Sequence, residues 1–147
     1  MTKWLDIARK YEGTAEVKGP QSNPLILHWL QIEGGGADWV KDDATPWCGA
    51  FMAAVFTECG LQHVVPKQPL AAISWASVGE RLKEPKIGCG CVIPRTGGNH
   101  VFLVADFDDK TLLGFGGNQG DRVGADTFHR DDRHAVYFWP VNEATPA

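Results

Sequence analysis

The stretch of sequence that decides the fold reads Thr45-Pro46-Trp47-Cys48-Gly49-Ala50-Phe51. Threonine followed by proline is typical of a helix start, because threonine caps free backbone N–H groups and proline fits the first helical position. The apolar residues that follow predict a helix from Trp47 to about Glu58, and Gly60 is placed to end it. In this interpretation Thr45 is the cap, and Cys48 lies at the third helical position.

The position of Cys48 favours a chemical role for its thiol. The first turn of a helix has unpaired backbone N–H groups and the positive end of the helix dipole, and both favour an anion. We therefore expect a lowered pKa and a nucleophilic thiolate at Cys48. The small neighbours Gly49 and Ala50 are expected to leave space for a substrate beside the sulfur.

Outward from this helix, the chain divides into a helical first part and a β-rich second part. Apolar spacing predicts further helices over the opening ten residues or so, after Asn23-Pro24, and over 71–82. The charged stretch 126–134 is expected to be a solvated hairpin tip. Short β-prone runs separated by glycine or Asp-Asp turns predict strands over 91–94, 100–107, 111–115 and 135–140. Helices followed by strands predict a single α+β domain over 1–147 with an antiparallel sheet.

The composition is that of one ordinary globular domain. The 147 residues are 44% apolar and 22% charged, which excludes general disorder, and the net charge of −4 argues against nucleic acid as a partner. The N-terminus has no continuous apolar stretch, and no run elsewhere reaches the roughly 18 residues of a membrane span. We therefore expect synthesis in the cytoplasm without a signal peptide, no membrane insertion and free thiols.

A thiolate nucleophile needs a base, and His100 is the candidate. It follows a glycine-rich turn and begins an apolar strand, whereas the other four histidines are expected to be packing, solvent or rim residues. The next predicted strand runs into Gly116-Gly117-Asn118-Gln119, so a hairpin would return these amides to the side of His100. Asn118 is the expected partner that orients the imidazole, and Gln119 is the near alternative.

The remaining cysteines leave a metal site to consider. Cys89 and Cys91 are two residues apart and would share a face of a strand, so His100 or Cys48 could complete a zinc site with them. Structural zinc sites normally use two cysteine pairs, and the chain has no second pair. We expect no metal and no cofactor, and we expect Cys59 to be a core thiol.

Four segments together resemble the NlpC/P60 and CHAP group of papain-like cysteine peptidases, and more narrowly its compact phage endolysin-type branch. They are Asn23-Pro24-Leu25-Ile26, the stretch from Asp43 to Phe51, Asn99-His100-Val101 and Gly116-Gly117-Asn118-Gln119. The resemblance covers nearly the whole chain in the family's order. It implies a papain-like fold, in which N-terminal helices include a cysteine-bearing helix that packs on a C-terminal antiparallel sheet.

The resemblance also implies an activity, the hydrolysis of amide bonds in bacterial peptidoglycan. The enzyme would be an endopeptidase or an N-acetylmuramoyl-L-alanine amidase that works through a thioester. Position by position, Cys48 matches the nucleophile, His100 the general base and Asn118 the orienting residue. One departure is Gly88-Cys89-Gly90-Cys91, where many relatives have Gly-Asp.

Beside these residues, Trp47, Asp43 and Gln119 are expected to line the substrate cleft. The enzyme would act on the cell wall, with a holin, a phage particle or a secretion system giving access to it. The alternative hypothesis is a noncatalytic binding or structural module of the same fold, with a metal at the cysteines.

Overall fold

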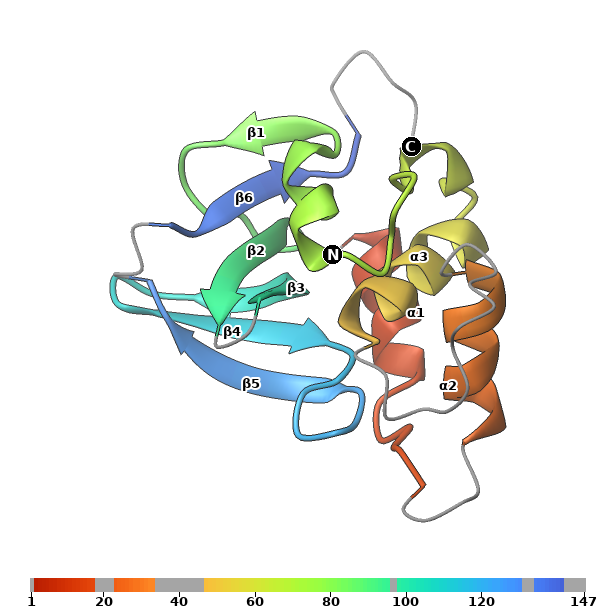
Figure 1. Ribbon diagram of the computed structural model, residues 1–147. Coiled ribbons are helices and arrows are strands. Elements are labelled where there is room, and N and C mark those ends of the chain that lie inside the picture. Colours follow the sequence, from red (N-terminus) through yellow and green to blue (C-terminus); the bar gives the residue numbers. More distant parts are fainter. Residues whose placement is uncertain (1, 18–22, 34–46, 96–97, 131–133, 142–147) are drawn as a thin grey trace.

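A computed structural model describes residues 2–17, 23–33, 47–95, 98–130 and 134–141. The helices gather on one side of the molecule and the strands form one antiparallel sheet on the other (Figure 1). The predicted α+β class, with helices first and sheet second, is confirmed. No helix in these ranges is long and apolar enough to cross a bilayer.

The helical half contains three α-helices and three short helical turns in the described ranges. They are α1 (Lys3–Lys10), α2 (Pro24–His28), the π-helical η1 (Trp29–Glu33), α3 (Cys48–Glu58), and the 3-10 turns η2 (Gln62–Val64) and η3 (Ala72–Ser77). The predicted cap at Asn23 is confirmed, because its side-chain oxygen accepts a hydrogen bond from the backbone N–H of Leu25 at 2.9 Å.

The sheet has six strands in the order β1-β6-β2-β3-β4-β5, and every neighbouring pair is antiparallel. The strands are β1 (Glu80–Leu82), β2 (Gly90–Arg95), β3 (Gly98–Phe107), β4 (Thr111–Gly116), β5 (Gly124–His129) and β6 (Val136–Trp139). The β2–β3 ladder places Ile93 opposite His100 and Arg95 opposite Gly98.

Two predictions about the sheet are wrong, and both concern its edges. The helix predicted over 71–82 ends at Ser77, and Glu80–Leu82 form edge strand β1. The stretch predicted as a hairpin tip contributes most of edge strand β5, which pairs with β4 from Gly116↔Gly124 to Thr111↔His129. Edge strands bury few side chains, so neither segment shows the apolar alternation of an inner strand.

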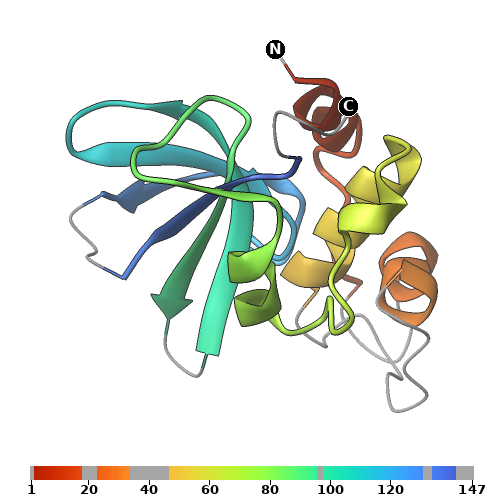
Figure 2. The same cartoon turned by 90° about the horizontal axis from the view of Figure 1, so that it is seen from above.

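The core lies on both faces of β3, because successive side chains of a strand point to opposite faces. Val101 and Leu103 join the large cluster that the helices supply, which includes Phe51 and Trp75. Phe102, on the other face, belongs to a second cluster with Cys89, Cys91, Val104, Leu112 and Tyr137. Seen from above, the helices lie against one side of the curved sheet (Figure 2). Helix α3 contacts β3, and the backbone N–H of Val101 in β3 reaches Cys48 at the start of α3.

Candidate active site

Cys48 is the first residue of α3, and its side chain is only 5% exposed. Trp47 occupies the cap position and its side chain makes no capping hydrogen bond. The prediction that Cys48 is the third helical residue is therefore wrong by two positions, because Cys48 is the first. The predicted cap Thr45 and the proline Pro46 lie outside the described residues. Cys48 still stands in the first turn, where backbone N–H groups have no partner within the helix.

The predicted low pKa of Cys48 is also wrong. The backbone N–H of Val101 donates a hydrogen bond to the sulfur, and the N–H groups of Gly49 and Cys48 also lower the pKa of the thiol. Burial has the larger effect and raises the pKa of Cys48 above its ordinary value. The resting group is therefore a neutral thiol, held beside the peptide that joins His100 to Val101.

His100 lies near the beginning of β3 and is 1% exposed. Its ring packs beside the rings of Phe102 and Phe128, with centroid distances of 5.6 and 5.8 Å. Its Nε2 atom lies 3.0 Å from the side-chain oxygen of Gln119. The imidazole is thus fixed by aromatic packing and by one polar partner.

Gln119 determines which nitrogen of His100 carries the proton. Its amide nitrogen donates to the backbone oxygens of Gly114, at 3.0 Å, and Gly124, at 2.7 Å. The amide oxygen must therefore face His100, and since an oxygen accepts, the hydrogen is on Nε2. The remaining nitrogen, Nδ1, is a basic acceptor, and it is buried without a hydrogen-bond partner. This unpaired buried base belongs to the residue before Val101, whose backbone N–H donates to the sulfur of Cys48.

Asn118 does not have the predicted role of orienting His100. Its backbone is left-handed, with φ at 59°, and its side chain lines the cleft described below instead of contacting the imidazole. Gly120 and Asp121 are left-handed as well, with φ at 63° and 60°. This curled turn directs Gln119 inward, so the near alternative is the residue that the structure places against His100.

The pKa of His100 is lowered to about 4. Burial is the main cause, because the imidazolium ion loses its hydration. The hydrogen bond that the Nε2–H of His100 donates to Gln119 opposes this shift, whereas the cation of Arg95 adds to it. At neutral pH both His100 and Cys48 are therefore uncharged, and the resting site is a thiol and an imidazole rather than an ion pair.

A cleft of about 700 Å³ opens over Cys48. One part of its lining is largely apolar and comes from the segment 70–73, and another is polar and comes from Arg95, Asn99, Asn118 and Asp121. Arg95 is a residue that sequence reasoning missed. A lone basic residue before a glycine turn was the available signal, but nothing in the sequence showed that it faces the cleft.

Trp47 is not a wall of this cleft, contrary to the prediction. It is fully buried, and its indole N–H donates to a carboxylate oxygen of Glu16 at 3.0 Å. Its ring lies beside that of Trp29 in the core, with centroids 6.0 Å apart. A side chain packed in this way supports the start of α3 and has no surface left for a substrate. Asp43, the other predicted lining residue, lies outside the described residues.

Gly49 allows the backbone of Pro69 to pack closely against α3 and does not leave open space beside the sulfur. A Cβ atom built at this position would lie 1.9 Å from the backbone oxygen of Pro69. The indole N–H of Trp75 donates to the same oxygen at 3.0 Å. The space predicted for a substrate at Gly49 is thus filled by the chain segment that forms the apolar lining of the cleft.

The other three cysteines are buried thiols, and none of the four forms a disulfide. Burial raises the pKa of Cys89 to about 11, and Cys91 belongs to the same cluster on the far face of the sheet. Within the described ranges, no three His, Cys, Asp or Glu side chains are grouped as metal ligands would be. The pair Cys89 and Cys91 therefore acts as part of the core.

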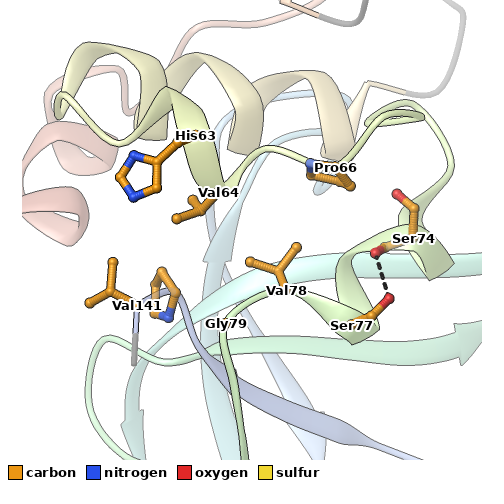
Figure 3. Close-up of a pocket in the computed structure, with 9 residues that line it drawn as sticks. His63, Val64, Pro66, Ser74, Ser77, Val78, Gly79 and Val141 are labelled. Atoms are coloured by element: carbon orange, nitrogen blue, oxygen red, sulfur yellow. Dashed lines mark hydrogen bonds between the residues drawn. The ribbon is translucent and has the colours of Figure 1, made fainter. Parts of the chain in front are cut away.

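A second pocket, of about 330 Å³, lies near the end of β6. Figure 3 shows His63 and Val64 on one side of it and Ser77, Val78 and Val141 on the other. It shares no lining residue with the cleft over Cys48. The lining of this pocket contains a histidine but no cysteine, so it offers no thiol nucleophile.

Comparisons with family models, with curated proteins and with solved structures find no match to this chain. What the site can do is therefore inferred from its own residues. A buried thiol at a cleft, and an unpaired buried base on the strand whose backbone N–H contacts the sulfur, are components that nucleophilic catalysis can use.

Proposed function

We propose that this protein is a cysteine hydrolase that cleaves amide bonds of bacterial peptidoglycan. The observation that carries the proposal is that the Cys48 thiol accepts a hydrogen bond from the N–H of Val101, the residue after His100, whose Nδ1 is buried without a partner and whose protonation Gln119 fixes. The substrate class comes from the resemblance of the sequence to NlpC/P60 and CHAP peptidases. A papain-like arrangement of the fold is part of the same proposal.

In the first step, the sulfur of Cys48 attacks the carbonyl carbon of the substrate amide. Because the resting thiol is neutral, Nδ1 of His100 removes its proton as the carbon–sulfur bond forms. The carbonyl π electrons move to oxygen, and the backbone N–H of Cys48 at the start of α3 is placed to stabilise this oxyanion. Gln119 stabilises the imidazolium, since its oxygen accepts from the Nε2–H.

In the second step, the tetrahedral intermediate collapses and the carbon–nitrogen bond breaks. The imidazolium of His100 returns its proton to the leaving nitrogen, so an amine departs and a thioester to Cys48 remains. His100 then removes a proton from water, which attacks the thioester carbon. The acid is released, and the sulfur regains its proton.

The proposal covers either of two bonds, within the stem peptide or between the sugar and L-alanine. The enzyme would work in lysis, on a virion or as an effector, with a holin, phage particle or secretion system bringing it to the wall. Mass spectrometry of the products identifies the bond, because the two cleavages release fragments of different mass.

The test is digestion of purified sacculi. We expect new soluble fragments and new free amines with the native protein, and none with Cys48→Ala or His100→Ala. Cys59→Ala is the matched control, because it removes a buried thiol that does not line the cleft, and it should retain the activity. Amine release that persists in Cys48→Ala, or no release from sacculi of several peptidoglycan types, would overturn the proposal.

The raised pKa of Cys48 favours a second candidate, a noncatalytic binding module. Such a module would use the same cleft for wall peptides and leave them intact. It predicts that native protein and Cys48→Ala sediment equally with sacculi and that neither releases an amine. Cys48-dependent release of an amine excludes it.

A further inference from the structure

The cleft over Cys48 has two chemically different linings. Leu70, Ala71, Ala72 and Ile73 supply the first, and Ile73 is 56% exposed. Arg95, with Asn99, Asn118 and Asp121, supplies the second. An extended peptide could place small apolar side chains against the first lining and its polar or charged groups against the second.

Arg95 is the charged residue whose field acts on both Cys48 and His100. In the β2–β3 ladder Ile93 lies opposite His100, and Arg95 is two residues further along β2. Residues two apart share a face of a strand, so Arg95 lies on the face of His100 at roughly 7 Å along the strand. The side chain of Arg95 lines the cleft together with Cys48.

The charge of Arg95 is not neutralised within the described part of the chain. The ion pairs found there join Lys10 to Glu58 and Arg130 to Glu84, and neither involves Arg95. The other charged residue of the cleft, Asp121, forms no ion pair with it. The field of Arg95 reaches both reacting groups, because it lowers the pKa of Cys48 and that of His100. Asp121 is not among the groups that shift either pKa.

We propose that Arg95 binds a carboxylate of the substrate in the cleft that contains Cys48 and so selects wall peptides that carry a free carboxylate over those in which it is amidated. The inference rests on the proposed function and adds the substrate class. A guanidinium suits this task, because its planar array of N–H donors can bind both oxygens of a carboxylate, while a carboxamide offers one acceptor and no charge.

The test uses two muropeptides that differ at one group, the α-carboxylate or the α-carboxamide of the γ-linked glutamyl residue. Values of kcat/KM are measured for both with the native protein and with Arg95→Gln, Arg95→Lys and Lys110→Gln. Lys110 is the charge control, because it follows β3 at the opposite end from His100 and is exposed. The ratio of the two substrates cancels the effect that Arg95 has on Cys48 before substrate binds, and the Kd values described below separate binding of the carboxylate from any effect of its charge on the reacting groups.

We expect the native protein to prefer the carboxylate muropeptide by about tenfold or more, the effect of one charge-assisted hydrogen bond. The preference should fall to about one in Arg95→Gln, remain in part in Arg95→Lys and be unchanged in Lys110→Gln. It should also weaken as salt is raised, because Arg95 is exposed. Equal, Cys48-dependent cleavage of both muropeptides would overturn the inference and leave the proposed function standing.

A binding measurement separates the two proposals if neither muropeptide is cleaved. Titration calorimetry with Cys48→Ala and with Cys48→Ala/Arg95→Gln measures the Kd for both muropeptides. Tighter binding of the carboxylate form that depends on Arg95 supports the inference even when hydrolysis fails. No Arg95-dependent difference in Kd, together with no cleavage, overturns both proposals.

Discussion

Lowering the pH from 7.5 to 4.5 should destabilise the folded protein through His100. The pKa of this side chain falls from its ordinary value of 6.5 to about 4 in the fold, because burial disfavours the imidazolium. Between these two values the unfolded chain binds a proton that the native protein does not bind. The contribution of His100 to the free energy of unfolding is therefore fully present above pH 6.5 and is lost as the pH falls toward 4.

The size of the effect follows from the two pKa values. Linkage gives a loss of about 1 kcal/mol at pH 5.5 and about 2–3 kcal/mol at pH 4.5. His100 is almost completely buried, so solvent screening does not reduce this value substantially. Because a domain is typically stable by about 5–15 kcal/mol, one histidine would account for a large part of the acid sensitivity.

Urea unfolding of the native protein and of His100→Gln, at pH 7.5, 5.5 and 4.5, measures the effect. The variant lacks the titrating group and keeps the other four histidines, so the difference between the proteins isolates His100. That difference should change by about 2–3 kcal/mol between pH 7.5 and 4.5. A difference that does not vary with pH would refute the reasoning, as would an NMR titration of His100 with a midpoint near 6.5.

Three further outcomes are expected. Gln119→Met keeps the size of the side chain but removes its three hydrogen bonds, so it should lower the free energy of unfolding by about 2–4 kcal/mol in urea titrations. Gly49→Ala should cost about 2–3 kcal/mol, because the new Cβ meets the backbone oxygen of Pro69 at 1.9 Å; Gly13→Ala, with no neighbour within 4 Å, tests the cost of a positive φ alone. Alkylation of Cys48 by iodoacetamide should increase only as the pH approaches and passes 9, because burial raises its pKa; rapid labelling at pH 6 would contradict this.

The helical half and the inner strands follow from local signals in the sequence. Asn23 before a proline predicts the start of α2, and apolar residues predict α3, where the structure has them. These signals work because a buried face imposes a period on the side chains. The edge strands β1 and β5 could not be predicted in this way, because they bury few side chains and their apolar residues show no regular alternation.

The candidate nucleophile and base can also be selected from the sequence, but their supporting residue cannot. The choice between Asn118 and Gln119 depends on the backbone between β4 and β5, where three residues have positive φ. Asparagine and aspartate tolerate that conformation better than most residues, yet their presence does not show which neighbouring side chain turns inward. The carbonyl oxygens of Gly114 and Gly124 complete the environment of Gln119, and they belong to different strands.

The charge state of Cys48 shows most clearly what local sequence leaves open. A helix start favours a thiolate through its N–H groups, and that argument needs only the sequence around Cys48. Burial depends on the packing of β3 and the segment 70–73 over the sulfur, and it reverses the expected direction of the pKa. Charge must then be created during attack, where Arg95 favours the developing thiolate and opposes the imidazolium, while Gln119 favours the imidazolium. A substrate carboxylate that neutralises Arg95 would weaken both of its effects, the one that favours the thiolate and the one that opposes the imidazolium.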